Sequence, residues 1–325
     1  MLGGFRLRIA WATATMYVKQ KRVVAYQMNK AWQRFGDYRA RRQRGGVRTL
    51  YEDVQLSLRN EVPIASRRWR GQPDVGYLKP LIDQAKKEAD DLEHSDSLSG
   101  AKAWHWLRAL VLQAPQAALA QAQMDTHPHG YHARGERLYE LIDFNDAFVS
   151  TVLTLDESLL ADFAEQAQRL MDWFCKRVGV RSLSEEQYTA IVRGLSREIA
   201  VYRGVRAEGF DSHMTSRTSD ALGIDMVITD AKTGKYVNID CKAPSAYRHR
   251  VYDLLREGRL TEEEVTAAEM LGYIGEMNGH GSERTEVIVW RIEKERYGEI
   301  AAFSFPDTAA LGQTIRAILN TYGVK

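Results

Sequence analysis

The stretch GIDMVITDAKTGKYVNIDCK, which runs from Gly223 to Lys242, has the pattern of two short strands joined by a tight turn. Apolar and polar residues alternate on both sides of the turn, which is typical of strands with one buried face. Gly234 can supply the positive φ that a hairpin loop of about four residues needs. The stretch therefore predicts an antiparallel hairpin.

The register of this hairpin follows from its turn. If Asp230 faces Lys235, then Asp225 faces Asp240, although a bulge would shift the pairing by one residue. Side chains alternate between the faces of a strand, so one face is expected to be apolar core and the other polar. The apolar face would contain Met226, Ile228, Val237, Ile239 and Cys241, and the polar face Asp225, Val227, Asn238, Asp240 and Lys242.

Facing carboxylates repel each other, so some group must stabilise Asp225 opposite Asp240. Lys242 would do so in part. A divalent cation such as Mg²⁺ would also do so, because hard cations take carboxylate oxygens as ligands. The polar face of the hairpin therefore indicates a metal site.

A third carboxylate is expected on the helix that precedes the hairpin. Ser184 and Gln187 match a capping box at the start of that helix. At about 100° of turn per residue, Glu198 lies about 20° from Ile191, in the middle of the apolar stripe. A buried carboxylate needs a metal ion, a hydrogen-bonding group or a basic partner such as Arg203.

Residues 183–325 predict a mixed-sheet α/β or α+β domain, because helical and strand patterns alternate along them. The fold class predicted for the whole chain is therefore this C-terminal domain with a mostly α-helical N-terminal and middle region. The elements expected in the domain are a helix over 185–206, strands near 210–217, 224–230 and 236–242, helices over 246–257 and 262–277, strands over 285–293 and 299–304, and a helix over 307–322.

Residues 76–182 predict a helical domain. Apolar residues recur at helical spacing within 81–94, 101–113 and 156–178. A polar loop between the second and third of these segments carries three histidines, His127, His129 and His132. These could ligate zinc, but no cysteine is near to complete a structural site, and a solvated loop is the favoured interpretation.

Residues 1–75 form a basic, aromatic-rich region, with 16 Lys and Arg against 5 Asp and Glu. This is an excess of +11, and because the whole chain has a net charge of +2, the remaining residues carry −9. Arg41, Arg42 and Arg44 lie near aromatic residues, and this combination suits nucleic acid, because guanidinium groups pair with phosphates and rings stack on bases. A solvated basic helix or a disordered arm would give the same composition.

Other features exclude several classes of protein. The chain contains no run of about 18 apolar residues, which argues against a membrane span. Its two cysteines, Cys175 and Cys241, lie far apart, so a disulfide framework is not expected and a reducing, cytoplasmic setting is. The phosphate-binding loop of many ATPases and helicases is also absent from the sequence.

Four residues, Glu198, Asp225, Asp240 and Lys242, occur in a characteristic order. Twenty-six residues separate the first two, 14 separate the two aspartates, and the last aspartate and the lysine form the triplet D-C-K. This pattern resembles the PD-(D/E)XK nuclease superfamily, whose members place a glutamate on a helix, an aspartate at the start of a strand and (D/E)-X-K on the partner strand. The match covers roughly residues 185–305, with Ile224 where the motif's name has proline.

The resemblance implies a restriction-endonuclease-like fold and an active site that uses Mg²⁺ or Mn²⁺. The catalytic residues would be Glu198, Asp225, Asp240 and Lys242, and the metal ligands would be Asp225, Asp240, the backbone carbonyl of Cys241, and Glu198. Lys242 would orient or deprotonate the attacking water and stabilise the developing charge. Asp220 is a rival for the middle aspartate, but it precedes the strand.

Basic and aromatic residues near the hairpin are candidates for contact with nucleic acid. Arg217 lies on the strand before Asp225 and could line the cleft. Tyr247, Arg248 and Arg250 lie near the start of the next helix, where the helix N-terminus favours phosphate. Simple surface charge is the alternative for these residues.

The leading interpretation is a DNA endonuclease of restriction or defence type, with nucleic acid as its partner and DNA favoured over RNA. A homodimer is expected, because cutting two strands often uses two active sites. The alternatives are a toxin-like RNA-cleaving nuclease and a catalytically inert nuclease-fold protein that binds nucleic acid.

Overall fold

The computed structural model of the chain describes residues 49–62, 68–69, 72–92, 99–126, 138–215, 223–278 and 284–324. They form two compact units: one takes in the described residues up to 119 with 150–157 and 165–182, and the other those of 120–149, 158–164 and 183–324. Several predicted site residues lie outside the described ranges, so their assignments stay predictions. These are Arg41, Arg42, Arg44, His127, His129, His132, Arg217 and Asp220.

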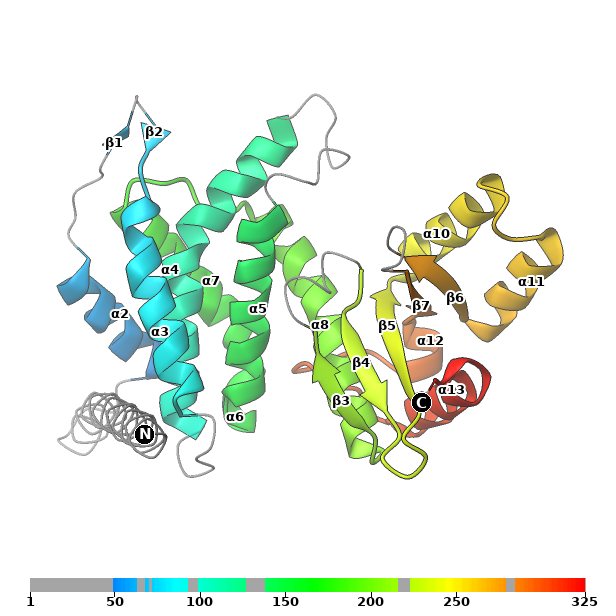
Figure 1. Ribbon diagram of the computed structural model, residues 1–325. Helices are drawn as coiled ribbons and strands as arrows, with labels where there is room; N and C mark the ends of the chain where they lie inside the picture. Colours follow the sequence, from blue (N-terminus) through cyan, green and yellow to red (C-terminus); the bar gives the residue numbers. More distant parts are fainter. Residues whose placement is uncertain are drawn as a thin grey trace, which may run out of the picture. The chain divides into compact units, whose positions relative to one another are not determined.

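The first half of the chain is mainly helical (Figure 1). Its elements are α2 (Leu50–Glu61), the paired short strands β1 (Arg68–Trp69) and β2 (Gln72–Pro73), the 3₁₀ turn η1 (Gly76–Leu78), α3 (Lys79–Asp90), α4 (Ser99–Thr126), α5 (Leu138–Thr154), α6 (Glu157–Leu160) and α7 (Phe163–Arg177). The three predicted helical segments are confirmed, and the third is divided into α6 and α7. No helix in the described ranges is long and apolar enough to cross a membrane.

The second unit is built on a five-stranded mixed sheet in the order β3-β4-β5-β7-β6. Only β5 and β7 pair in parallel, and every other neighbouring pair is antiparallel. Its strands are β3 (Asp211–Met214), β4 (Met226–Thr229), β5 (Tyr236–Lys242), β6 (Tyr273–Asn278) and β7 (Thr285–Arg291). The helices that accompany them in residues 183–324 are α8 (Glu185–Ala207), α10 (Pro244–Arg256), α11 (Glu262–Leu271), α12 (Lys294–Tyr297) and α13 (Ala309–Tyr322).

Helices cover both faces of this sheet (Figure 1). Residues of α8 and α13 pack on the face that carries Met226, Ile239 and Cys241. Residues of α10 and α11 pack on the opposite face, against Ile274 and Val289. The unit is therefore a mixed α/β structure, as the sequence predicted.

The predicted helix over 262–277 is wrong in its second half. α11 ends at Leu271 because Gly272 adopts a left-handed conformation, with φ of 78°, and closes the helix with its N–H bonded to the carbonyl of Ala268. The following residues form β6, at the edge of the sheet. Their strand conformation is fixed by pairing with β7, which the local sequence does not reveal.

The strand predicted over 299–304 is also wrong. The chain forms the short helix α12 and then a tight turn, in which Ala302 and Phe303 have positive φ and a single bridge joins Ala301 to Ser304. Phe303 is buried, so the apolar residues that suggested a strand are packed by a turn.

Candidate active site

The hairpin of β4 and β5 has the predicted turn, and it has the predicted register from Met226 to Thr229. The N–H of Asp230 donates to the carbonyl of Lys235 at 2.9 Å, and Gly234 has a φ of 71°. Met226 pairs with Ile239, which is the register expected from the turn. The predicted apolar face is confirmed, since all five of its side chains are buried in one cluster.

Asp225 lies at a bulge at the start of β4. Its N–H donates to the carbonyl of Ile239 at 2.8 Å, although Ile239 is already the partner of Met226. Two residues therefore oppose one, which is the pattern of a β-bulge. Asp225 does not sit opposite Asp240 in the ladder, and the shift that the sequence left open does occur.

The bulge still brings the two aspartates together. The N–H of Cys241 donates to Oδ2 of Asp225 at 2.6 Å, and the carboxyl groups of Asp225 and Asp240 lie close enough for their charges to interact. Burial raises the pKa of Asp225 well above its ordinary value, and the negative charges of Glu198 and Asp240 raise it further. Glu198, which is half-buried on α8, is thus within electrostatic range of the pair.

Lys242 lies beside the acids. Its Nζ is 2.7 Å from Oδ1 of Asp240, which is buried at 5% exposure. Burial alone would lower the pKa of Lys242, but the carboxylates of Asp240 and Asp225 outweigh this effect and raise it. Burial raises the pKa of Asp240, and the Lys242 ammonium opposes that rise. Lys242 is therefore held as a cation within the acid cluster, which we define as Glu198, Asp225 and Asp240.

The acid cluster has the donor chemistry of a hard-cation site, since all its ligating atoms are carboxylate oxygens. In the present arrangement, one oxygen of Asp225 accepts from Cys241 and one of Asp240 faces Lys242. Within the described ranges, no three His, Cys, Asp or Glu side chains are placed to hold a metal ion. Asp225 and Asp240 are the residues of this cluster that could hold a cation, with Glu198 within electrostatic range of Asp225.

The predicted nucleic-acid contacts on α10 differ in their surroundings. Tyr247 is fully buried, and its hydroxyl donates to the carbonyl of Ala268 at 2.8 Å. It packs in the core between α10 and α11, so its predicted contact with nucleic acid is wrong. Arg248 is mostly exposed and lies 3.6 Å from Glu269.

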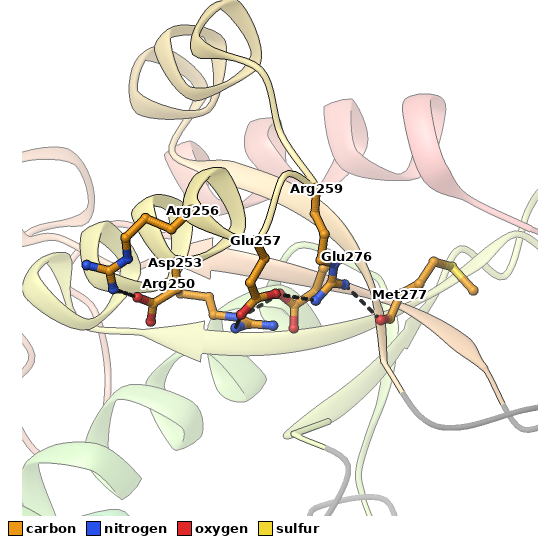
Figure 2. Close-up of polar contacts among 7 residues, drawn as sticks. All are labelled: Arg250, Asp253, Arg256, Glu257, Arg259, Glu276 and Met277. Carbon is orange, nitrogen blue, oxygen red and sulfur yellow. Dashed lines mark hydrogen bonds and ion pairs between the residues drawn. The ribbon is translucent and has the colours of Figure 1, made fainter.

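Arg250 is held in a network of charged side chains (Figure 2). Its Nε donates to Glu276 at 2.7 Å, and Nη1 lies 3.7 Å from Glu257. Glu257 also accepts from Arg259, whose other guanidinium nitrogen donates to the carbonyl of Met277. The network ties α10 to the edge strand β6, which gives Arg250 a structural role that the sequence did not suggest.

Two residues that the sequence analysis did not single out lie near the acid cluster. Glu276 is buried on β6, and its charge contributes to the raised pKa of Asp240. It was missed because its segment was assigned to a helix. Arg197 directly precedes Glu198 on α8, and its charge interacts with Glu198 and Asp225. The sequence could have pointed to Arg197 only through its position next to Glu198.

The chain was compared with protein-family models, curated proteins and solved structures, and none of them matches it.

Proposed function

We propose that the sheet unit is a metal-dependent nuclease that hydrolyses phosphodiester bonds in nucleic acid, with DNA favoured over RNA. The observation that carries this proposal is the convergence of Asp225, Asp240 and Lys242 at one point of the β4–β5 hairpin. The order of elements supports it: a helix that bears Glu198, three antiparallel strands, the two helices α10 and α11, the edge strand β6, and then β7, which is parallel to β5. The resemblance to the nuclease superfamily leads one to expect the glutamate on a helix, the aspartate at the start of a strand and the D-C-K triplet on the partner strand.

Asp225 and Asp240 would hold Mg²⁺ or Mn²⁺, assisted by Glu198. When bound, such an ion polarises the scissile phosphate and lowers the pKa of a bound water. The proposed role of the carbonyl of Cys241 stays a prediction; the residue's N–H fixes Asp225, and its thiol is buried in the core.

Lys242 would act as a hydrogen-bond donor. Its raised pKa keeps Nζ protonated, so orientation of the attacking water and stabilisation of charge on the phosphate oxygens are favoured over removal of a proton from water. Nζ would then exchange its contact with Asp240 for contact with the substrate. Its side chain is 36% exposed, so the substrate could reach it from solvent.

Cleavage assays test the proposal. The purified chain would be incubated with plasmid, branched DNA, single-stranded DNA and RNA, in Mg²⁺, Mn²⁺ or EDTA, beside Asp225→Asn and Lys242→Gln. The matched control is Asp211→Asn, which changes a half-exposed aspartate on β3 of the same sheet. Metal-dependent cleavage that is lost in the two site variants and kept in the control is the expected result.

Two other outcomes would contradict the proposed activity. Cleavage of RNA alone would favour the RNA-cleaving alternative. Binding of nucleic acid without cleavage, unchanged by either substitution, would favour the inert nuclease-fold alternative. The expected homodimer is tested separately, by measuring the mass of the protein in solution with and without DNA.

A further inference from the structure

Three basic side chains on β5 and α10 already have acidic partners. Lys242 faces Asp240, and Arg248 faces Glu269. Arg250 faces Glu276 and Glu257 (Figure 2). A phosphate that approached any of these groups would compete with a carboxylate. Of the arginines predicted from sequence to contact nucleic acid, Arg248 and Arg250 would therefore have to give up an existing contact to bind phosphate.

Arg197 differs from these residues. It lies half-buried on α8, directly before Glu198, and in the described part of the chain its guanidinium makes neither a hydrogen bond nor an ion pair. Burial lowers the pKa of Arg197, and the nearby Cys241, Glu198 and Asp225 only partly oppose this effect. A half-buried cation without an acceptor is unfavourable for the folded protein, and such groups call for an explanation.

Arg193 lies one helical turn before Arg197, and its positive charge repels that of Arg197. It is exposed, has no hydrogen bond or ion pair among the residues that the structure places, and its positive charge contributes to the lowered pKa of Arg197. Like charges four residues apart destabilise a helix by a few tenths of a kcal/mol. α8 thus carries two neighbouring guanidinium groups whose repulsion an anion would relieve.

We propose that Arg197 binds a backbone phosphate of the nucleic acid at the acid cluster, and that Arg193 contacts the adjoining phosphate along α8. Guanidinium pairs with phosphate through two parallel hydrogen bonds, which is the geometry that an arginine without an acceptor can offer. The inference rests on the proposed nuclease function. It also offers a way to offset the repulsion between the acid cluster and the phosphate of the substrate. Three carboxylates repel a phosphodiester, so a cation beside Glu198 and Asp225 would help the substrate to approach.

A contact of this kind is independent of base sequence, because phosphate contacts position a nucleic acid and base contacts specify it. It has two measurable signs. Loss of Arg197 should weaken binding to unrelated sequences by the same factor. It should also lower the slope of log affinity against log salt concentration by about 0.9 for duplex DNA, since one phosphate fewer is neutralised.

The test measures binding on an Asp225→Asn background in Mg²⁺, where cleavage is expected to be lost. The probes are labelled duplex DNAs of two unrelated sequences and a single-stranded RNA of the same length. Adding Arg197→Gln should weaken binding about tenfold on both duplexes and lower the salt slope. Arg197→Lys should keep the slope, because it keeps the charge, but should bind less tightly than the parent, because it cannot pair through two parallel bonds. The RNA arm shows whether the same contact serves both nucleic acids.

The matched control is Arg206→Gln, on the same helix. Arg206 bonds to the carbonyl of Ser212 and the hydroxyl of Tyr202, and it lies 4.0 Å from Asp211. Its loss should leave the affinity and salt slope of the parent unchanged. Thermal unfolding separates binding from folding: Arg197→Gln should keep or raise the melting temperature, whereas loss of a structural arginine would lower it.

The outcomes distinguish this inference from the proposed activity. Unchanged affinity and slope in Arg197→Gln would overturn the inference, and wild-type cleavage would still support the nuclease. A lowered slope in a chain that never cleaves would support the contact and contradict catalysis. A parent chain that binds neither DNA nor RNA would overturn both.

Discussion

The backbone N–H of Cys241 donates a 2.6 Å hydrogen bond to Oδ2 of Asp225. At a regular position of an antiparallel ladder, such an N–H would bond to a carbonyl of the neighbouring strand. At the bulge, the side chain of Asp225 takes the place of that carbonyl, while its own N–H bonds to Ile239. Asp225 is therefore part of the strand pairing as well as of the candidate active site, and its orientation is set by the main chain.

Asp225→Asn should stabilise the fold while it abolishes cleavage. Asparagine keeps an acceptor for Cys241 and can donate to Asp240, but it removes a charge that Glu198 and Asp240 repel. The folded chain holds the Asp225 proton to a higher pH than the unfolded chain does, so wild-type stability falls as pH rises from about 3.8 toward the raised pKa. The advantage of the variant should therefore grow with pH.

Urea unfolding at about pH 5 and about pH 8 measures this difference. Asp211→Asn, which changes an aspartate whose side chain is 50% exposed, should alter stability little at either pH. A variant that is less stable than wild type at the higher pH would show that repulsion within the acid cluster is not the dominant effect at Asp225. Cleavage should fall at least about 100-fold.

Lys242→Gln should reduce cleavage by about 10²–10³-fold, because a hydrogen-bond donor to the developing charge is lost. The same change leaves buried Asp240 without its cation, and we expect about 1 kcal/mol of lost stability, since the lysine side chain is 36% exposed and partly screened by solvent. Lys294→Gln is the control, because Lys294 is 65% exposed in its contact with Glu299. Equal losses of cleavage activity and of stability in Lys242→Gln and Lys294→Gln would contradict a special role for Lys242.

Arg250→Met should destabilise the chain by about 2–3 kcal/mol, because the Glu276 side chain, only 5% exposed, would be left as a buried charge without its partner. The double variant Arg250→Met/Glu276→Met should recover much of this loss, since it removes both charges. Arg248→Met, on the same helix but 64% exposed, should change stability by less than about 0.5 kcal/mol. Chemical denaturation of the wild type and these three variants measures the differences in stability. A double variant no more stable than Arg250→Met would argue against coupling between the two side chains.

Two glycine-to-alanine substitutions should have opposite signs. Gly272→Ala places a Cβ at a φ of 78°, and 3.2 Å from Nη1 of Arg296, so it should destabilise the fold by about 1 kcal/mol. Gly194→Ala, inside α8, adds a Cβ with no atom within 4 Å and improves helix propensity, so it should be neutral or stabilising by up to about 1 kcal/mol. Melting temperatures of the two variants test this, and a shift of the same sign in both would contradict the assigned role of Gly272.

The parts of the fold that depend on local sequence were the parts that sequence could predict. The alternation in β4 and β5 and the glycine of their turn fixed the hairpin register, and the Ser184–Gln187 capping box is present at the start of α8. β6 was missed because its strand conformation comes from pairing Tyr273 with Trp290, a contact with a later part of the chain.

The candidate site shows the same division. The sequence named Glu198, Asp225, Asp240 and Lys242, and the structure brings these residues within hydrogen-bonding or electrostatic range. The bulge at Asp225 was left open, since nothing in the residues themselves selects it. The burial of Tyr247 depends on which side of α10 meets the sheet, and the absence of an acceptor for Arg197 among the described residues depends on every neighbour in space.

The position of β5 in the sheet has a consequence for how the chain folds. One edge of β5 pairs with β4, its neighbour in sequence, while the other pairs with β7, where Asp240 lies beside Val289. During synthesis, β7 leaves the ribosome about 50 residues after β5, so the hairpin can form early but its second edge must wait. The carboxylate of Asp240 on β5 therefore reaches its final surroundings only when nearly the whole unit has been made, and a nascent or truncated chain that ends before β7 should have no assembled site.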